Sequence, residues 1–335
     1  MTTVASHLLM PSDCALLLRA MASTLRPRAD FQHSLPEIHM FARAVSILSL
    51  LSSFALAGAS QPGHAAGVAV SPQFDTTHVY VAPEDFDRFT ESLLATFGGT
   101  MTKQGVFQVT PTASQTISQL VLTPVGSFSV FGFKTPIPYP FGLERTGYLV
   151  TDMDAAVKLA KQHGADVVVE TFPDPIGRDA IIEWPGGVHM QLYWHTQAPS
   201  YAALKTVPEN RVYVSRDRAD AFIRDWVGFS GGKVLADEAK APGLEIGRPA
   251  DSYRSVQIES AFGKMNVFVT DGRLPYPYGH EMSGYAVDKL ADTLGKATAA
   301  GASLIVAPFE SRGRQSAIVQ FPGGYIAEIH APAGL

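Results

Sequence analysis

The sequence is poor in the residues that would build a covalent or thiolate framework. Cys14 is the only cysteine among the 335 residues, and it lies in the N-terminal leader. The folded part can therefore form no internal disulfide and no thiolate metal site, so any metal must be bound by nitrogen and oxygen ligands. The sequence also lacks a Gly-rich phosphate loop and the G-x-S-x-G motif of many serine hydrolases.

Charged residues are few and nearly balanced in sign. Asp, Glu, Lys and Arg make up 17% of the chain, and the formal net charge is −5. Hydrophobic residues make up 46%, which is typical of a globular protein. Because a nucleic-acid-binding protein needs a basic surface, we expect no nucleic-acid partner.

A long apolar run occurs near the N-terminus. After Met40 come the positive Arg43, an apolar stretch over 44–56 and the small residues Ala57-Gly58-Ala59 in an A-x-A arrangement. This order is typical of a secretory signal. The apolar stretch is shorter than the roughly 20 residues that span a bilayer. We therefore predict a cleaved signal peptide over 40–66, export to a bacterial periplasm or the medium, and no stable membrane span.

The sequence on either side of the signal carries less information. Residues 1–39 show no element of their own, and an export signal should begin near the true N-terminus. We predict that 1–39 is a non-native extension and that translation starts at Met40. The Gly-, Ala- and Pro-rich stretch from Gln61 to Gln73 is predicted to be disordered, so that 67–74 serves as a linker.

The rest of the chain is a tandem duplication. The stretch 138–194, which begins PYPFGLERTGYLV, recurs from Pro275 as PYPYGHEMSGYAV, and most of it aligns at one spacing of 137 residues (275 − 138 = 137). Upstream of each copy, 78–99 matches 211–232, with a shared Val-Tyr-Val and a final Gly-Gly. Any chemistry must be sought in a cavity that each copy builds and in how the copies diverge.

Each copy contains two β-α-β-β-β modules. A β-branched run over 77–81 is followed by apolar residues at helical spacing, which Gly98-Gly99 end, and then by three strand-like runs. The second module repeats this order. The strands that follow the third helix are predicted over 244–246, 255–260 and 264–269. We therefore predict an α+β chain of four modules in two domains, 75–197 and 208–333.

The motifs of the repeat resemble those of the vicinal oxygen chelate superfamily. They are GY-x-V-x-D-x-DAA at a helix start, then GA-D-V-V-V, GRDA-I-I and PGG before a final strand, over 145–195. The superfamily includes glyoxalase I, bleomycin-resistance proteins, type I extradiol dioxygenases and methylmalonyl-CoA epimerase. The resemblance covers 75–332 and implies a half-open mixed sheet around a cavity in each domain.

The resemblance also implies where a metal would lie. In the enzymes of the superfamily a divalent Fe, Mn, Ni or Zn ion is bound by His on the first strands of the modules and Glu on the last strands. In the first domain these positions hold His78, Arg145 and Gln191. His78 is a candidate ligand or general base, or else a hydrogen-bonded histidine at a strand start. Glu144 reaches this face only if the register slips by one residue.

The second domain has the complementary deficit. Its corresponding positions hold Arg211, Met282 and Glu328, with His280 and His330 nearby. His330 shares a strand face with Glu328, whereas His280 precedes its strand. Neither domain has a complete ligand set. His78, Gln191 and Glu328 are the candidate metal ligands, and His78 and Glu328 are the candidate catalytic residues.

The two arginines at ligand positions have two interpretations each. Arg211 can neutralise Glu328 inside the second cavity, or it can bind a ligand. Arg145 can bind a ligand carboxylate or phosphate, or it can pair with Glu144 or Glu183.

Three tyrosines complete the candidate site residues. Tyr80 and Tyr213 lie two residues after His78 and Arg211, and with Tyr193 they are expected to form aromatic cavity walls. We therefore expect an exported glyoxalase-like protein that binds a small organic ligand. The alternative is a metal-dependent lyase or extradiol-type dioxygenase with an atypical site. A homodimer is compatible with the fold, although a tandem chain can also pair its domains internally.

Overall fold

The computed structural model describes residues 67–280 and 282–334. The extension predicted over 1–39 and the signal peptide predicted over 40–66 lie outside the described residues. Within the described ranges, no helix has the length and apolar character needed to cross a membrane.

The first sheet is built from two modules of consecutive chain. Its strands are β1 (Thr76–Tyr80), β2 (Thr100–Met101), β3 (Gly105–Phe107), β4 (Thr116–Thr123), β5 (Gly126–Phe133), β6 (Thr146–Leu149), β7 (Asp166–Asp174), β8 (Gly177–Trp184) and β9 (Val188–His195). Their order is β2-β4-β5-β1-β6-β9-β8-β7, with β3 also paired to β4. The two module-opening strands, β1 and β6, lie side by side and antiparallel in the middle.

The second sheet repeats this topology. Its strands are β10 (Glu209–Ser215), β11 (Lys233–Pro242), β12 (Ser252–Ser260), β13 (Gly263–Thr270), β14 (Met282–Ala286), β15 (Ser303–Ser311), β16 (Arg314–Gln320) and β17 (Ile326–Pro332). Their order is β11-β12-β13-β10-β14-β17-β16-β15. The predicted fold class is therefore confirmed: four β-α-β-β-β modules form two tandem glyoxalase-like domains with mixed sheets.

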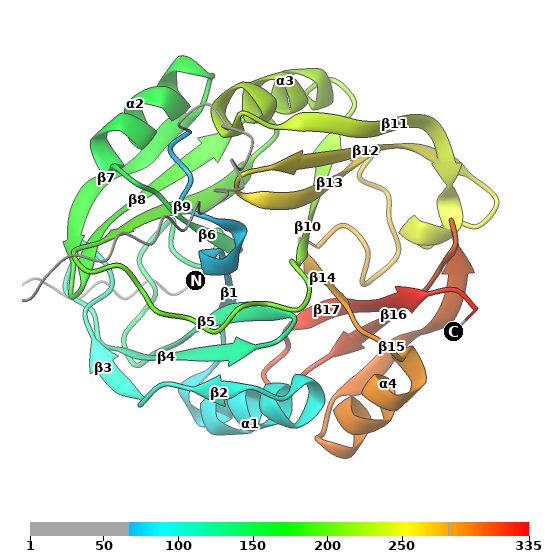
Figure 1. The fold of residues 1–335 in the computed structure, drawn as a ribbon, viewed down its shortest axis with the longest axis horizontal. Helices are drawn as coiled ribbons and strands as arrows, with labels where there is room; N and C mark the ends of the chain where they lie inside the picture. The colour runs from blue at the N-terminus through cyan, green and yellow to red at the C-terminus, as the bar shows by residue number, and fades with distance from the viewer. Residues whose placement is uncertain (1–66, 281, 335) are drawn as a thin grey trace, which may run out of the picture. The chain divides into compact units, whose positions relative to one another are not determined.

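One helix follows the opening strand of each module. The helices are α1 (Phe86–Phe97), α2 (Met153–Gln162), α3 (Ala219–Ser230) and α4 (Leu290–Ala299), and they lie at the periphery in Figure 1. The sequence sets their ends. In α2, for example, the Asp152 carboxylate caps the first turn by accepting from the Ala155 N–H at 2.8 Å, and Gly164 just beyond the last turn has φ +82°.

The hydrophobic core combines modules from both domains. One cluster joins the second module to the third, with Tyr148 and Trp184 packed on Trp226. The other joins the first module to the fourth, with the rings of Phe128 and Tyr285 5.2 Å apart. The two domains therefore pair internally through buried aromatic contacts.

Strand alternation separates this core from the inner face of each sheet. On β1, Val79 is buried in the core cluster, whereas its neighbours His78 and Tyr80 line a cavity on the other face. On β9, Leu192 is in the core and Gln191 and Tyr193 line the same cavity. The period of two residues thus positions the candidate site.

Two local predictions are wrong. The strand predicted over 244–246 is a 3-10 turn, η3 (Gly243–Ile246), and the strand is instead β11, which precedes it. Its sequence, KVLADEAKAP, is highly charged because β11 is an exposed edge strand that buries little side-chain area. The segment 67–74 is not a disordered linker, since Ala69 bridges Val150 and the Val70 N–H donates to Leu149.

Candidate functional site

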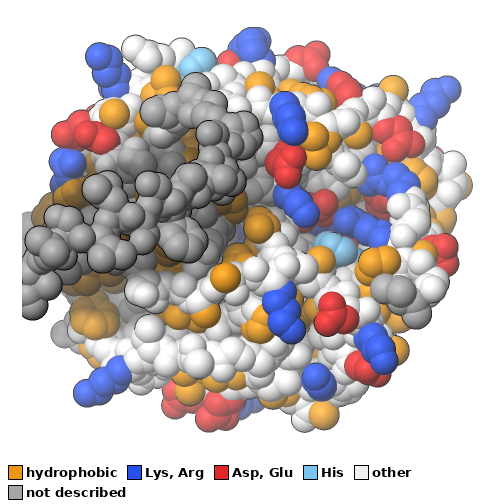
Figure 2. Space-filling model, viewed as in Figure 1, with side chains coloured by type: hydrophobic (Ala, Val, Ile, Leu, Met, Phe, Trp, Pro, Cys, Tyr) orange, Lys and Arg blue, Asp and Glu red, His pale blue; other side chains and the backbone are white. Residues whose placement is uncertain are grey.

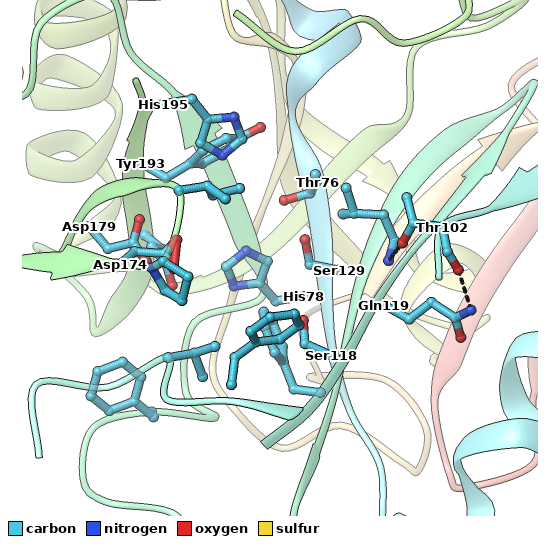
Figure 3. A pocket seen from close by; sticks show the side chains of 18 of the residues that line it. Thr76, His78, Thr102, Ser118, Gln119, Ser129, Asp174, Asp179, Tyr193 and His195 are labelled. Atoms are coloured by element: carbon cyan, nitrogen blue, oxygen red, sulfur yellow. Dashed lines mark hydrogen bonds between the residues drawn. The ribbon is translucent and has the colours of Figure 1, made fainter. Parts of the chain in front are cut away.

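The first sheet encloses a cavity of about 250 Å³. Figure 3 shows His78 near its centre, with Asp174 and Asp179 on one side and Ser129 on the other. The wall is largely apolar. Its hydrophobic members are Phe107, Val109, Leu120, Phe131, Phe141 and Ile176. A concave apolar pocket with a few convergent polar groups is the usual form of a small-molecule site.

A buried carboxylate lies beside the histidine at the centre of the cavity, although Nδ1 of His78 forms no hydrogen bond within the described residues. The Nδ1 atom of His78 lies 3.7 Å from Oε1 of Glu144, and both side chains are almost fully buried. The Tyr80 hydroxyl donates to the same carboxylate, and the Gly142 N–H donates to its second oxygen at 3.1 Å. Burial, and then the charge of Glu144, raise the pKa of the Tyr80 hydroxyl. Glu144 thus joins His78 and Tyr80 without a register slip, because it lies in the loop just before β6.

A glycine provides the space for the His78 ring. A Cβ added to Gly147 on β6 would overlap Nε2 of His78 and would lie 3.0 Å from Oγ1 of Thr76. In the second domain the side chain nearest to the corresponding Gly284 comes from the last strand and not from the opening strand, since a Cβ there would lie 2.6 Å from Oε2 of Glu328. The Gly-Tyr pair of each repeat therefore leaves room for the side chain at the ligand position of its domain.

Two aspartates that the sequence analysis did not single out face this cavity. Asp179 on β8 is 6% exposed, and half-buried Asp174 ends β7. Burial raises the pKa of Asp174 to about 6. Burial, and then the charges of Asp174 and Glu144, hold the pKa of Asp179 well above its usual range. The pair can therefore hold a proton near neutral pH.

A signal for Asp179 was present in the sequence. It alternates with the core residues Ala180 and Ile182, so it had to face the side of β8 opposite the core. The repeat offers a second signal, because the structure pairs Phe172 with Asp179 and Phe309 with Ser316, at the repeat spacing (316 − 179 = 137). A carboxylate in one copy thus replaces a small hydroxyl in the other.

The last strand of the first domain adds three side chains. Gln191, Tyr193 and His195 of β9 all line the cavity. The Tyr193 hydroxyl donates to the Phe74 carbonyl, and burial raises its pKa. Burial lowers the pKa of His195, which favours its neutral form. The predicted residues His78, Tyr80, Gln191 and Tyr193 are therefore brought together in one cavity.

In the second domain the same face is filled by protein side chains. The guanidinium of Arg211 lies over the Phe268 ring, 4.5 Å from its centroid. Tyr213 and Tyr253 stack on that ring at 4.9 Å and 5.3 Å. Arg211 is 3% exposed, and Nε finds no hydrogen-bond partner. The predicted ligand-binding residue Arg211 thus packs against the interior of its own domain, whereas Tyr213 also lines a separate pocket of about 390 Å³ with Leu274 and Tyr278.

Glu328 lies close to arginine and histidine side chains. Its Oε2 accepts from His330 at 2.7 Å, and its Oε1 lies 3.6 Å from Arg314. Burial would raise the pKa of Glu328, but the charge of Arg211 and the His330 hydrogen bond outweigh it and hold the pKa well below the usual range. Burial likewise opposes the charge of Arg211, yet Glu328 raises its pKa. Glu328 is therefore an ionised structural partner of Arg211, Arg314 and His330.

A second buried carboxylate lies in the interior of the second domain. Glu245 of η3 is 3% exposed and accepts hydrogen bonds from Tyr253 at 2.6 Å and from Ser311 and Arg312 at 2.7 Å. Burial would raise the pKa of Glu245, but the hydrogen bonds from Arg312, Tyr253 and Ser311 lower it.

On the face seen in Figure 2, basic and acidic side chains are interspersed over the second sheet.

Two predicted positions lie elsewhere. Arg145 is half-buried and does not line the cavity, and its charge acts on the hydroxyls of Tyr80 and Tyr325. Within the described residues it forms no ion pair with Glu144, and Glu183 pairs with His189 at 3.3 Å instead. His280 is exposed and contacts Tyr276, so it does not reach Glu328.

The ligand set of the superfamily metal does not fit either domain. In the first, Arg145 stands at the second ligand position and only the amide of Gln191 at the third. In the second, Arg211 stands at the first position, and a buried guanidinium would repel a cation. Across 67–280 and 282–334, no group of three or more His, Cys, Asp and Glu side chains is arranged to hold a metal ion.

Comparisons with solved structures find chains that resemble this one. A triple mutant of 4-hydroxymandelate synthase from Streptomyces coelicolor superposes with a TM-score of 0.52 at 11% identity, over 80% of this chain and 93% of that chain. A 2,3-dioxygenase from Pseudomonas sp. KL28 gives 0.49 at 11% identity, over 80% and 93%. A catechol 2,3-dioxygenase gives 0.45 at 13% identity, over 80% and 90%.

The likeness to the synthase extends to the fold and no further, because an identity of 11% carries no information on activity. No family model matches the sequence, and no curated protein matches it. The chain thus has the fold of the vicinal oxygen chelate superfamily, and its function must be argued from the cavity itself.

Proposed function

We propose that this chain is a glyoxalase-like protein that binds a small organic ligand in the cavity of its first domain, without a firmly held catalytic metal. The single observation that carries the proposal is the contrast on the inner faces of the two sheets. The first leaves a cavity of about 250 Å³ lined by aromatic rings and a few polar groups. The second packs Arg211, Tyr213 and Phe268 against one another.

The cavity size and chemistry limit the ligand. Ligand pockets usually measure roughly 300–1,000 Å³, so this cavity suits a molecule of one or two rings. Tyr80, Phe131 and Tyr193 offer flat apolar surface, and His78 and Gln191 offer hydrogen bonds. A planar ligand with one or two polar groups satisfies both requirements.

The second candidate is a metal-dependent lyase or extradiol-type dioxygenase with an atypical site. One observation favours it: His78 and Gln191, at two of the superfamily ligand positions, line the same cavity, and Glu144 lies 3.7 Å from His78. Imidazole, carboxylate and amide oxygen are ligands that Fe, Mn, Ni and Zn accept. One observation counts against it: the Glu144 carboxylate already accepts hydrogen bonds from Tyr80 and Gly142.

Elemental analysis of the purified protein after dialysis separates the two candidates. Our proposal expects far less than one Fe, Mn, Ni or Zn per chain, and the same result for His78→Ala. One metal ion per chain that survives dialysis and is lost in His78→Ala would overturn the proposal in favour of the metal-dependent enzyme. Glu328→Ala tests the candidate ligand of the second domain in the same way.

We also propose export of the mature chain, on the basis of the signal-like sequence over 40–66. N-terminal sequencing of the protein recovered from a bacterial host tests this step. A mature N-terminus between Ser60, just after the A-x-A site, and Gly67, just after the predicted signal peptide, is expected. A chain that retains Met1 or Met40 would contradict it.

A further inference from the structure

We propose that the first-domain cavity takes an organic cation, namely a compact aromatic or otherwise flat apolar amine whose ammonium group is bound by Asp179 and Asp174. This inference rests on the proposed function and adds the charge of the ligand to it.

The first argument is the isolation of Asp179. Its side chain is 94% shielded from solvent, since 6% of its surface is exposed, and it lines the cavity. Within the described residues it has neither an ion-pair partner nor a hydrogen-bond donor. A buried carboxylate without a cation is costly, so a cation supplied by a ligand would recover much of that cost.

The second argument is the charge of the cavity as a whole. Asp174 lies on the same side of the cavity as Asp179 in Figure 3, and no described cation pairs with either carboxyl group. Lys103 is the one basic Lys or Arg side chain on the described wall, and it is exposed. Burial disfavours the charged form of His195. The cavity therefore offers acceptors for a positive group and little to neutralise them.

The third argument is the aromatic part of the cavity wall. Tyr80 and Phe131 lie with their ring centroids 5.2 Å apart, and Phe131 also meets the His78 ring edge-on at 5.3 Å. Such faces bind flat apolar groups and attract cations through their π electrons. A molecule with an aromatic body and a short aminoalkyl arm can use both surfaces.

The fourth argument comes from the other copy of the repeat. The positions of Asp174 and Asp179 are occupied by Ser311 and Ser316 in the second sheet. There the carboxylate beside Ser311 is Glu245, which is buried, and the protein supplies its own cation, Arg312. Where the second domain carries a carboxylate with an internal arginine partner, the first carries carboxyl groups without one.

Calorimetric titration with matched probes tests the inference. The probes are benzylamine, benzyl alcohol and benzoate, and the same series built on 1-naphthylmethyl, each added to the full mature chain. The amines should bind about 10-fold more tightly than the alcohols, since hydrogen bonds to charged groups are the stronger ones. The carboxylates should bind more weakly than the alcohols.

Variants assign the effect to the two carboxyl groups. Asp179→Asn and Asp174→Asn keep the side-chain shape and should each reduce the preference for amine over alcohol at least five-fold. Asp154→Asn on α2, whose carboxylate is exposed and pairs with Arg178, is the matched control and should leave the preference unchanged.

Each contrary outcome has its own meaning. If an alcohol binds as tightly as its amine, the cation inference is wrong and the proposed small-molecule site stands. If a carboxylate binds best, the cavity recognises anions and the inference is again wrong. If no member of either series binds, the proposed function itself fails. Unchanged preference in both Asn variants would also overturn the assignment to Asp174 and Asp179.

Discussion

The two domains share one fold but use the inner faces of their sheets differently. In the first domain the opening strand carries His78 and the last strand carries Gln191, and a cavity remains between them. In the second domain the same strands carry Arg211 and Glu328, which neutralise each other in a packed interior. Charge pairing in the second domain thus occupies the place that corresponds to the cavity of the first domain.

The comparison shows how few positions decide between a cavity and a core. Gly147 and Gly284 occupy the same place in both sheets and make room for the facing side chain. What differs is whether that side chain has an internal partner. His78 has a carboxylate behind it and open space before it, whereas Glu328 meets His330 and Arg314.

The largest expected effect comes from neutralising Glu328. Glu328→Gln removes the negative charge near Arg211 and breaks the buried contacts with His330 and Arg314, and removal of one partner from a buried pair costs about 3–5 kcal/mol. Urea unfolding should show a loss of this size in the free energy of unfolding. The matched change in the first domain, Gln191→Ala, should cost about 1 kcal/mol. Equal losses in the two variants would contradict the difference between the domains.

The next largest effect is expected at the repeated glycines. Gly147→Ala places a methyl group against the His78 ring, which is itself packed on Phe131 and cannot withdraw easily. Overpacking of this kind costs about 1–3 kcal/mol, and ligand affinity should fall about 10-fold as the ring is displaced. Gly284→Ala should leave ligand affinity unchanged, because its clash is with Glu328 in the other domain.

The two domains should also respond to acid with opposite sign. The folded-state pKa of Asp174 is raised to about 6, so its proton stabilises the fold at low pH. That stability is lost as pH rises from about 4 through 6. Asp174 is half-buried, and solvent screening reduces the expected effect to about 1–2 kcal/mol. The folded-state pKa of Glu328 is lowered, so its contribution is present at neutral pH and is lost as pH falls below about 4.5, the usual value for Glu.

Urea unfolding across pH 3–8 measures both effects. The double change Asp174→Asn with Asp179→Asn should flatten the decline between about pH 4 and 7. Glu328→Gln should remove the loss in acid. If the double Asn variant changed the loss of stability in acid, or if Glu328→Gln changed the decline above about pH 4, the pKa shifts would be assigned to the wrong domain.

The smallest effect is expected from Arg145. Because Arg145 does not line the cavity, Arg145→Ala should change the affinity for any ligand of the first domain by less than about two-fold. Calorimetric titration measures it, with Phe131→Ala as the control that must lose affinity. A 10-fold loss in Arg145→Ala would restore the interpretation of Arg145 as a ligand-binding residue.

The fold was predictable because each local sequence pattern occurs in both copies of the repeat. The repeated strand-helix order predicted four modules, and strand alternation correctly placed His78 with Tyr80, and Arg211 with Tyr213, on the inner faces. β11 was not predicted, because an exposed edge strand buries little side-chain area and its sequence need not be apolar.

The candidate site was predictable only in part. Glu144 reaches His78 from a loop, and no strand pattern describes the direction of a loop side chain. Asp174 and Asp179 act together only because the β7–β8 hairpin brings them to one cavity. That the second interior is filled depends on η3 and on the contacts of Glu245 with Ser311 and Arg312, which are distant in sequence.

The stoichiometry of ligand binding tests the central claim most directly, because it counts open cavities. Titration of the mature chain with 1-naphthylmethylamine should give one molecule bound per chain. Ser129→Trp, which fills the cavity beside His78, should abolish that binding, whereas Asn266→Gln at the paired position of the second sheet should not. Two molecules bound per chain, or binding that survives Ser129→Trp, would contradict the account.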